Sequence, residues 1–183
     1  PRRAVLARAR TAPCARAAWD QLWAQGPPVG FVEAPPSVDA IVARTAFLAS
    51  LVGAEAAGRA LVARIEQGFA TLAHWRDTHP TGRRVLFVMR MTNGHPMVAG
   101  RETAADAIIG LTGAVNAGGA MQGYKVVEHE ALLTLRPDVI LTMAQDAASL
   151  RATILSDPGF KMTPAARHGA LIAREGEALL GLG

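Results

Sequence analysis

The sequence predicts an α/β protein: a lobe built on a doubly wound, mostly parallel sheet, preceded by a long interlobe helix and a remnant of a second α/β lobe. Predicted strands and helices alternate along most of the chain, which is typical of parallel sheets with helices on both faces. Two runs, Val85–Met89 and Val139–Met143, are almost wholly apolar, as in strands covered on both faces. A proline-free stretch from Ala54 to about His79 has the apolar spacing of a helix.

Composition and charge argue against several classes of protein. Half of the 183 residues are hydrophobic, so a sizeable core can form. Charged residues interrupt each apolar run before the roughly 20 residues that cross a bilayer. Cys14 is the single cysteine, and no paired cysteine and histidine spacing indicates zinc. The net charge is +4, but no aromatic residues interleave with the arginine-rich start, so nucleic acid is not expected as a partner.

Residues 1–53 are expected to be the remnant of an N-terminal lobe. A helix is predicted over residues 15–25, where Gly26 and two prolines stop it, and a short strand over Val29–Val32. Ser37 is a good N-cap for a following helix, which carries regularly spaced apolar residues as far as Leu51.

Residues 54–79 are expected to form one interlobe helix. Apolar residues recur there at spacings of four, four, four and three: Ala57, Leu61, Ile65, Phe69 and Leu72. At 1.5 Å per residue the helix would be roughly 35–40 Å long, which exceeds what a compact three-layer domain needs. We therefore expect it to run between two lobes.

Residues 80–183 are expected to form the C-terminal, ligand-binding α/β lobe. Thr103 is predicted to cap a helix in which Asp106 lies near the positive end of the helix dipole. Residues 91–97 are expected to form an open loop after the first strand. The other predicted elements are a helix over 128–136, a strand over 139–143, a helix over 145–155, a turn at Pro158–Gly159, a helical turn from Thr163 and a strand over 170–173.

Three segments of the sequence carry a family resemblance: PMVAGRETAADAIIGLTGAVNA (96–117), GYKVVEHEALLTLRPDVIL (123–141) and the tail from PGFKMTPAAR to LLGLG (158–183). They resemble the haem substrate-binding proteins of bacterial ABC importers, which belong to a larger clamp family that also binds cobalamin and ferric siderophores. The first segment is the most specific. The resemblance begins at about Ala15 and is weak before Ala54. It implies two α/β lobes joined by one long helix, with haem gripped between them and delivered to the importer permease.

The sequence also departs from that family. A whole N-terminal lobe precedes the helix in family members, whereas about fifty residues do so here, so we expect a truncated member. The tyrosine that usually binds the iron belongs to that lobe and has no matching position. The resemblance implies a periplasmic location, although the chain shows no basic and then apolar leader. No GxSxG, HExxH or phosphate-loop pattern is present, so an enzyme is not expected.

Two residues are candidates for contact with the haem iron. His95 can bind ferric haem through a neutral imidazole or donate to a propionate; the alternative is a solvated loop histidine. Tyr124, the only tyrosine, is expected in a loop, where the neighbouring Lys125 would lower its pKa and favour the phenolate that binds ferric iron. The alternative is an interface tyrosine whose hydroxyl bonds to backbone.

Four further residues are candidate haem contacts. Arg101 lies in a GRxT segment that resembles the pocket edge of the family, and its guanidinium can form a forked pair with a propionate carboxylate. The alternative is an ion pair with Glu102, Asp106 or Glu128. Arg90, at the predicted end of a strand, is a second cation. Met91 and Met97 are polarizable and suit a porphyrin face, although core packing explains them equally well.

Other partners and functions stay open at this stage. Asp146 follows the second predicted strand, where the family carries an acidic group that docks on the permease; the alternative is an acid stabilised by a helix dipole. The chain is either a haem binder or, within the same family, a cobalamin or siderophore binder. From a different class, it is a non-catalytic domain that forms homodimers through an exposed lobe face and three tryptophans, Trp19, Trp23 and Trp75.

Overall fold

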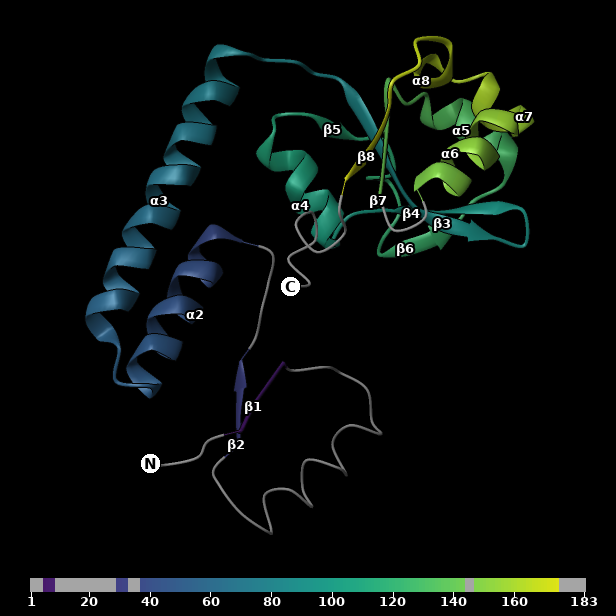
Figure 1. Ribbon diagram of the computed structural model, residues 1–183. Coiled ribbons are helices and arrows are strands. Elements are labelled where there is room, and N and C mark those ends of the chain that lie inside the picture. Colours follow the sequence, from purple (N-terminus) through teal and green to yellow (C-terminus); the bar gives the residue numbers. More distant parts are fainter. Residues whose placement is uncertain (1–4, 9–28, 33–36, 144–146, 175–183) are drawn as a thin grey trace. The chain divides into compact units, whose positions relative to one another are not determined.

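The computed structural model describes residues 5–8, 29–32, 37–143 and 147–174 (Figure 1). The chain divides into two compact units, residues 1–69 and 70–183, which are described separately. None of the described helices is both long enough and apolar enough to cross a membrane.

The first unit contains two short strands, one whole helix and the larger part of a second helix that continues beyond residue 69. Strands β1 (Val5–Arg8) and β2 (Val29–Val32) pair in parallel. Helix α2 (Val38–Leu51) begins at Ser37, whose hydroxyl accepts a hydrogen bond from the amide of Ala40 at 3.2 Å. The predictions of strand 29–32 and of a helix capped by Ser37 are confirmed, whereas β1 was not predicted. The helix predicted over 15–25 lies outside the described residues.

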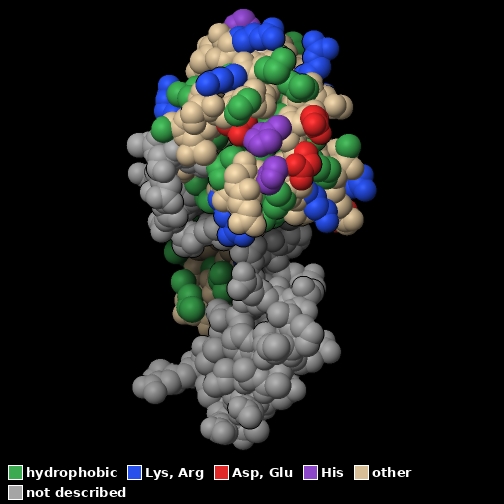
Figure 2. All heavy atoms as spheres, turned by 90° about the vertical axis from the view of Figure 1, so that its right-hand side faces the viewer, with side chains coloured by type: hydrophobic (Ala, Val, Ile, Leu, Met, Phe, Trp, Pro, Cys, Tyr) green, Lys and Arg blue, Asp and Glu red, His purple; other side chains and the backbone are tan. Residues whose placement is uncertain are grey.

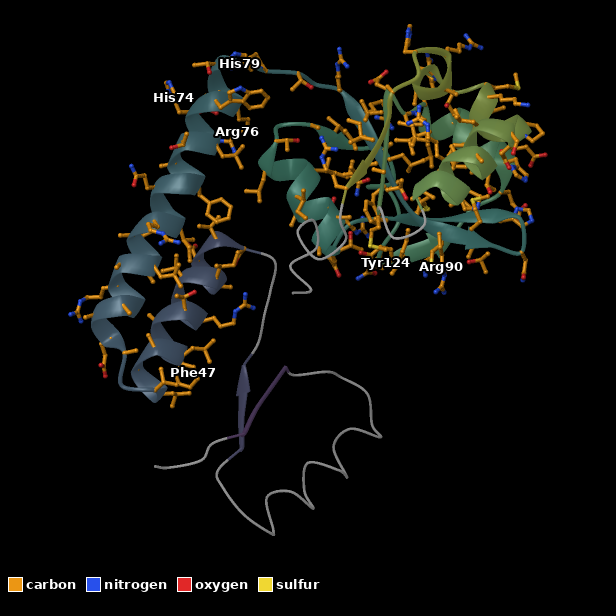
Figure 3. The ribbon with its side chains drawn as sticks, viewed as in Figure 1. Phe47, His74, Arg76, His79, Arg90 and Tyr124 are labelled. Carbon is orange, nitrogen blue, oxygen red and sulfur yellow. The ribbon has the colours of Figure 1, made fainter. Side chains whose placement is uncertain are left out.

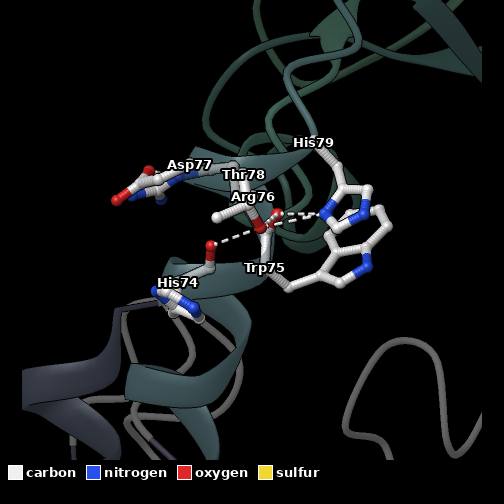
Figure 4. A network of polar contacts seen from close by, with 6 residues as sticks. All are labelled: His74, Trp75, Arg76, Asp77, Thr78 and His79. Atoms are coloured by element: carbon white, nitrogen blue, oxygen red, sulfur yellow. Dashed lines mark hydrogen bonds and ion pairs between the residues drawn. The ribbon is translucent and has the colours of Figure 1, made fainter.

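Helix α3 (Glu55–Thr78) is one uninterrupted helix of 24 residues, as the spacing predicted. It ends in a small network of polar contacts (Figure 4). The Thr78 hydroxyl lies 2.9 Å from the carbonyl oxygens of His74 and Trp75, so it satisfies helix carbonyls that have no partner within the helix. The His79 ring stacks on Trp75, with centroids 5.0 Å apart and planes 11° apart. The role of α3 as an interlobe helix stays a prediction.

The second unit is built on a six-stranded mixed sheet (Figure 1). Its main path runs β6–β4–β3–β7–β8, and β5 pairs with β3 beyond that path. Three pairs are parallel, β3 with β5, β3 with β7 and β7 with β8, and the two pairs made by β4 are antiparallel. The prediction of a mostly parallel α/β sheet is confirmed. The strands are β3 (Arg84–Thr92), β4 (His95–Ala99), β5 (Val115–Asn116), β6 (Tyr124–Val126), β7 (Val139–Met143) and β8 (Leu171–Arg174).

Helices cover both faces of this sheet, as expected for a doubly wound fold. Successive residues of β3 face opposite ways: Leu86 belongs to a buried cluster with residues of α5 to α8, and Phe87 to a second cluster with residues of α4. Figure 1 shows α4 on one side of the sheet and α5 to α8 on the other. The helices are α4 (Ala104–Leu111), α5 (His129–Leu135), α6 (Ala147–Ser156), α7 (Pro158–Lys161) and α8 (Pro164–Arg167).

The prediction of an open loop over residues 91–97 is wrong. The segment is a tight hairpin in which β3 runs to Thr92 and β4 starts at His95. The turn consists of Asn93 and Gly94, with φ values of 51° and 83°. Asn-Gly readily adopts positive φ at both central positions, and this geometry matches the twist of two antiparallel strands. Tyr124, predicted in a loop, is likewise in a strand, the short edge strand β6.

Candidate functional site

The segment that carries Arg101 is held against the chain that precedes β6. The amide of Gly100 donates to the carbonyl of Gly123 at 2.8 Å, and the amide of Arg101 donates to Met121 at 2.8 Å. The Gly123 amide returns a bond to the Arg101 carbonyl at 2.9 Å. A Cβ on Gly100 would collide with the Met121 carbonyl oxygen and lie 2.9 Å from the Gly123 oxygen. Glycine is therefore required for this close approach of two backbone segments.

Helix α4 starts directly after this segment. The hydroxyl of Thr103 accepts a hydrogen bond from the amide of Asp106 at 3.1 Å and donates to the carbonyl of Gly100 at 2.9 Å. The predicted Thr103 cap is confirmed, and the same hydroxyl ties the helix to the segment that presents Arg101.

The Arg101 side chain is exposed, and no ion pair or hydrogen bond joins it to another side chain in the described part of the protein. Its two nearest acidic neighbours in the sequence are engaged elsewhere. The Glu102 carboxylate accepts from the Gln122 amide at 2.7 Å, and the Asp106 carboxylate accepts from Asn116 at 2.8 Å. The structure thus does not contain the intramolecular ion pair with Glu102, Asp106 or Glu128 that was the alternative to ligand contact.

Tyr124 pairs with Ala99 in the sheet, and its ring packs against the α4 cluster. Burial raises the pKa of the Tyr124 phenol above its ordinary value, and a polar contact with Thr103 acts in the opposite direction. The expectation that Lys125 lowers this pKa is wrong. Successive residues of a strand point to opposite faces, so the neighbour in sequence is directed away from the phenol. At neutral pH the phenol is protonated, which opposes binding of iron as a phenolate.

Strand register places three side chains in one row on the same face as Tyr124. Arg90 of β3 pairs with Met97 of β4, and Met97 pairs with Val126 of β6. Directly paired residues of antiparallel strands share a face, and so do residues two apart in one strand. Arg90 is exposed and Val126 is 46% exposed. Figure 3 shows Arg90 and Tyr124 at the same edge of this unit.

Val126 was missed by the sequence reasoning. The signal was available in the alternation of Tyr124, Lys125 and Val126, which sends the first and third side chains to one face if the segment is a strand. Met91, by contrast, packs against the buried cluster that contains Leu86 and Val98, on the face opposite Met97. The two methionines that the sequence grouped together are thus separated by the sheet.

His95 lies at the other end of β4 from Ala99 and Tyr124. Four residues of a strand span about 13 Å, so the two candidate iron ligands are not brought together. The Nδ1 atom of His95 is 3.2 Å from a carboxylate oxygen of Glu128 but is not aligned for a hydrogen bond. The His95 ring is 5.2 Å from that of His129, whose Nδ1 lies 3.1 Å from an Asp157 carboxylate oxygen.

These contacts form a mixed histidine and acidic cluster on the surface of the second unit. Figure 2 shows histidine side chains beside acidic ones on one face. In the described part of the chain, no three histidine, cysteine or acidic side chains are arranged to hold a metal ion. The remaining candidates, Asp146, Trp19 and Trp23, lie outside the described residues.

Comparison with known proteins places these features in a family. Residues 5–177 match the profile of the family described as periplasmic binding protein. No curated protein sequence matches the chain. Among solved structures, the haem-binding protein BhuT, in complex with two haems, is 32% identical with a TM-score of 0.90. This chain superposes over 98% of its own length and 69% of the BhuT chain.

Two further haem-binding proteins are similar to this chain. RhuT from Roseiflexus sp. RS-1 is 29% identical with a TM-score of 0.86, over 98% of this chain and 69% of that one. HutB of Vibrio cholerae is 25% identical with a TM-score of 0.83, over 97% of this chain and 69% of that one.

Proposed function

Since this chain belongs to the periplasmic binding protein family, a family of non-catalytic, transport-related binding proteins, we propose that it binds haem for a bacterial ABC importer. The single observation that carries the proposal is the 32% identity with BhuT, over 98% of the chain, together with the haem that BhuT holds. RhuT and HutB, which are also named as haem-binding proteins, support it.

The side chains around β4 have the chemistry that haem requires. The ligand is a flat apolar macrocycle with two carboxylates on one edge, so its site needs an apolar surface bordered by cations. Met97, Val126 and the ring of Tyr124 supply apolar surface, Arg90 continues the row, and Arg101 is exposed without an acidic partner. We therefore propose that haem lies against this face, with a propionate on Arg101.

His95 is not an iron ligand in this proposal. Because it lies at the far end of β4, it is not expected to bind the iron of a haem that contacts Tyr124. Tyr124 is expected to contribute its ring rather than a phenolate, since burial raises the pKa of its phenol.

The experiment that tests the function is titration of the protein with haemin while the Soret band is recorded. We expect a saturable Soret shift that is weakened in Arg101→Ala and kept in His95→Ala. Competition with cobalamin and with a ferric siderophore tests the alternative ligands of the same family. If haemin gives no Soret shift and one of the competitors binds saturably, that competitor replaces haem as the proposed ligand.

The partners and location are proposed from the family. We expect the importer permease as the protein partner, with docking through Asp146, and a periplasmic location. A homodimer is a further proposal, and the exposed apolar residues Phe47, Leu51 and Val52 at the end of α2 support it. Light scattering that shows only a monomer at high concentration would refute the dimer and leave haem binding untouched.

A further inference from the structure

We infer that Gln122 is a positioning residue, which keeps the Glu102 carboxylate away from Arg101 and so leaves the guanidinium free for a carboxylate on the ligand. This inference rests on the proposed function, because it concerns how the same site selects a ligand that carries carboxylates. Asn116 holds the second nearby acid, Asp106, in the same way.

The first observation is that Glu102 is held by a neutral amide although a cation is its neighbour in sequence. The Nε2 atom of Gln122 donates to the Glu102 carboxylate at 2.7 Å, across 20 residues of sequence. Gln122 is also the bridge partner of Arg101 in the backbone pairing. Its amide therefore comes from the chain directly beside Arg101, where it can hold the carboxylate in place.

The second observation is an unusual backbone conformation at Glu102. Its φ is 64°, in the left-handed region that a residue with a side chain seldom adopts. The amide of Glu102 donates to the Asp106 carboxylate at 3.2 Å. This backbone bond and the Gln122 bond together determine the direction of the Glu102 side chain.

The third observation is that both carboxylate oxygens of Asp106 are occupied. One accepts from Asn116 at 2.8 Å and the other from the Glu102 amide at 3.2 Å. The Asn116 side-chain oxygen accepts from the amide of Gly118 at 2.9 Å, which leaves its nitrogen facing Asp106. Both acids thus have hydrogen-bond partners other than Arg101.

The arrangement has a direct consequence for binding. A carboxylate released next to Arg101 would compete with the ligand's carboxylate for the same guanidinium, whose fork is suited to one such partner at a time. Gln122 and Asn116 prevent this competition without adding charge of their own. Gln122→Ala should thus weaken binding of ligands that carry carboxylates and spare ligands that lack them.

The test compares haemin with haem dimethyl ester, in which both carboxylates are blocked. Gln122 is exposed, so Gln122→Ala is expected to fold normally, as circular dichroism would check. We expect Gln122→Ala to raise the Kd for haemin roughly twofold to fivefold, the range of an exposed ion pair, and to leave the Kd for the diester unchanged. The double variant Glu102→Gln/Gln122→Ala, which lacks the Glu102 charge and keeps Asp106 on Asn116, should restore wild-type affinity.

A second measurement needs no haem. Phenylglyoxal modifies free guanidinium groups, so the rate at which Arg101 is modified, read by mass spectrometry, should fall in Gln122→Ala and recover in the double variant. An unchanged rate in Gln122→Ala, equal weakening of both haem forms, or no recovery in the double variant would overturn the inference. Failure of wild-type protein to shift the Soret band would instead refute the proposed function, and the phenylglyoxal rates would still decide the role of Gln122.

Discussion

Replacement of Gly100 by alanine should destabilise the protein strongly, because the new methyl group has no space. A Cβ at this buried position would meet three backbone atoms, the carbonyl oxygen and carbon of Met121 and the carbonyl oxygen of Gly123. No side-chain rotation can relieve the contact, so the two chain segments must separate. Separation breaks the bonds from the Gly100 and Arg101 amides, both 2.8 Å long.

The magnitude follows from these two bonds. Each contributes about 1 kcal/mol net, and leaving a buried partner unpaired costs more, so the free energy of unfolding should fall by roughly 2–4 kcal/mol. Affinity for haemin should fall as well, because Arg101 is held by the same bonds.

The assay is urea denaturation of Gly100→Ala followed by circular dichroism, with Gly110→Ala as the matched control. Gly110 is an exposed residue within α4 where an added Cβ has nothing within 4 Å. Alanine there should stabilise the helix by about 0.5–1 kcal/mol. A Gly100→Ala protein as stable as the wild type would refute the argument from close approach.

Three other predictions concern single side chains. Arg101→Ala should weaken haemin binding several-fold, whereas Lys125→Ala, which removes an equal charge from the opposite side of β6, should have little effect; equal losses would indicate a general charge effect. Tyr124 should ionise above its ordinary pKa of 10.0 in the folded protein, and an ultraviolet titration of this single tyrosine with and without urea would show the difference. Because the folded protein holds the proton more tightly, the stability from Tyr124 is present below pH 10 and lost as pH rises above it; a folded-state midpoint at or below the urea value would contradict this. Phe160→Ala should lower the free energy of unfolding by about 3–5 kcal/mol, since a fully buried aromatic ring is removed, and a loss below 1 kcal/mol in thermal or urea unfolding would show that the site collapses around the gap.

Local signals predicted most of the helices and the buried strands. Ser37 and Thr103 cap helices because their hydroxyls reach amides three residues ahead, a property set by neighbours in sequence. Strand β7 has the predicted bounds, Val139–Met143, because an apolar run between polar flanks needs burial on both faces. The alternation of such strands with helices was enough to predict the fold class.

Local signals did not predict the hairpin or the short strands, and the causes can be identified. Asn93–Gly94 is a strong hairpin signal, although Gly and Asn are also common in the open loop that was expected there. Strands β5 and β6 contain two and three residues, too few for alternation alone to identify a strand. They exist because β3 and β4 offer unpaired backbone groups at their edges, which only the assembled sheet provides.

The sequence by itself determined the fold class, the helix caps and the set of polar and apolar residues from which a haem site can be built. Only the tertiary structure decided which of them lie together. The register of β3, β4 and β6 places Arg90, Met97 and Val126 side by side and leaves His95 at the far end. Register depends on hydrogen bonds between segments distant in sequence, and a shift by one residue would turn each side chain to the opposite face.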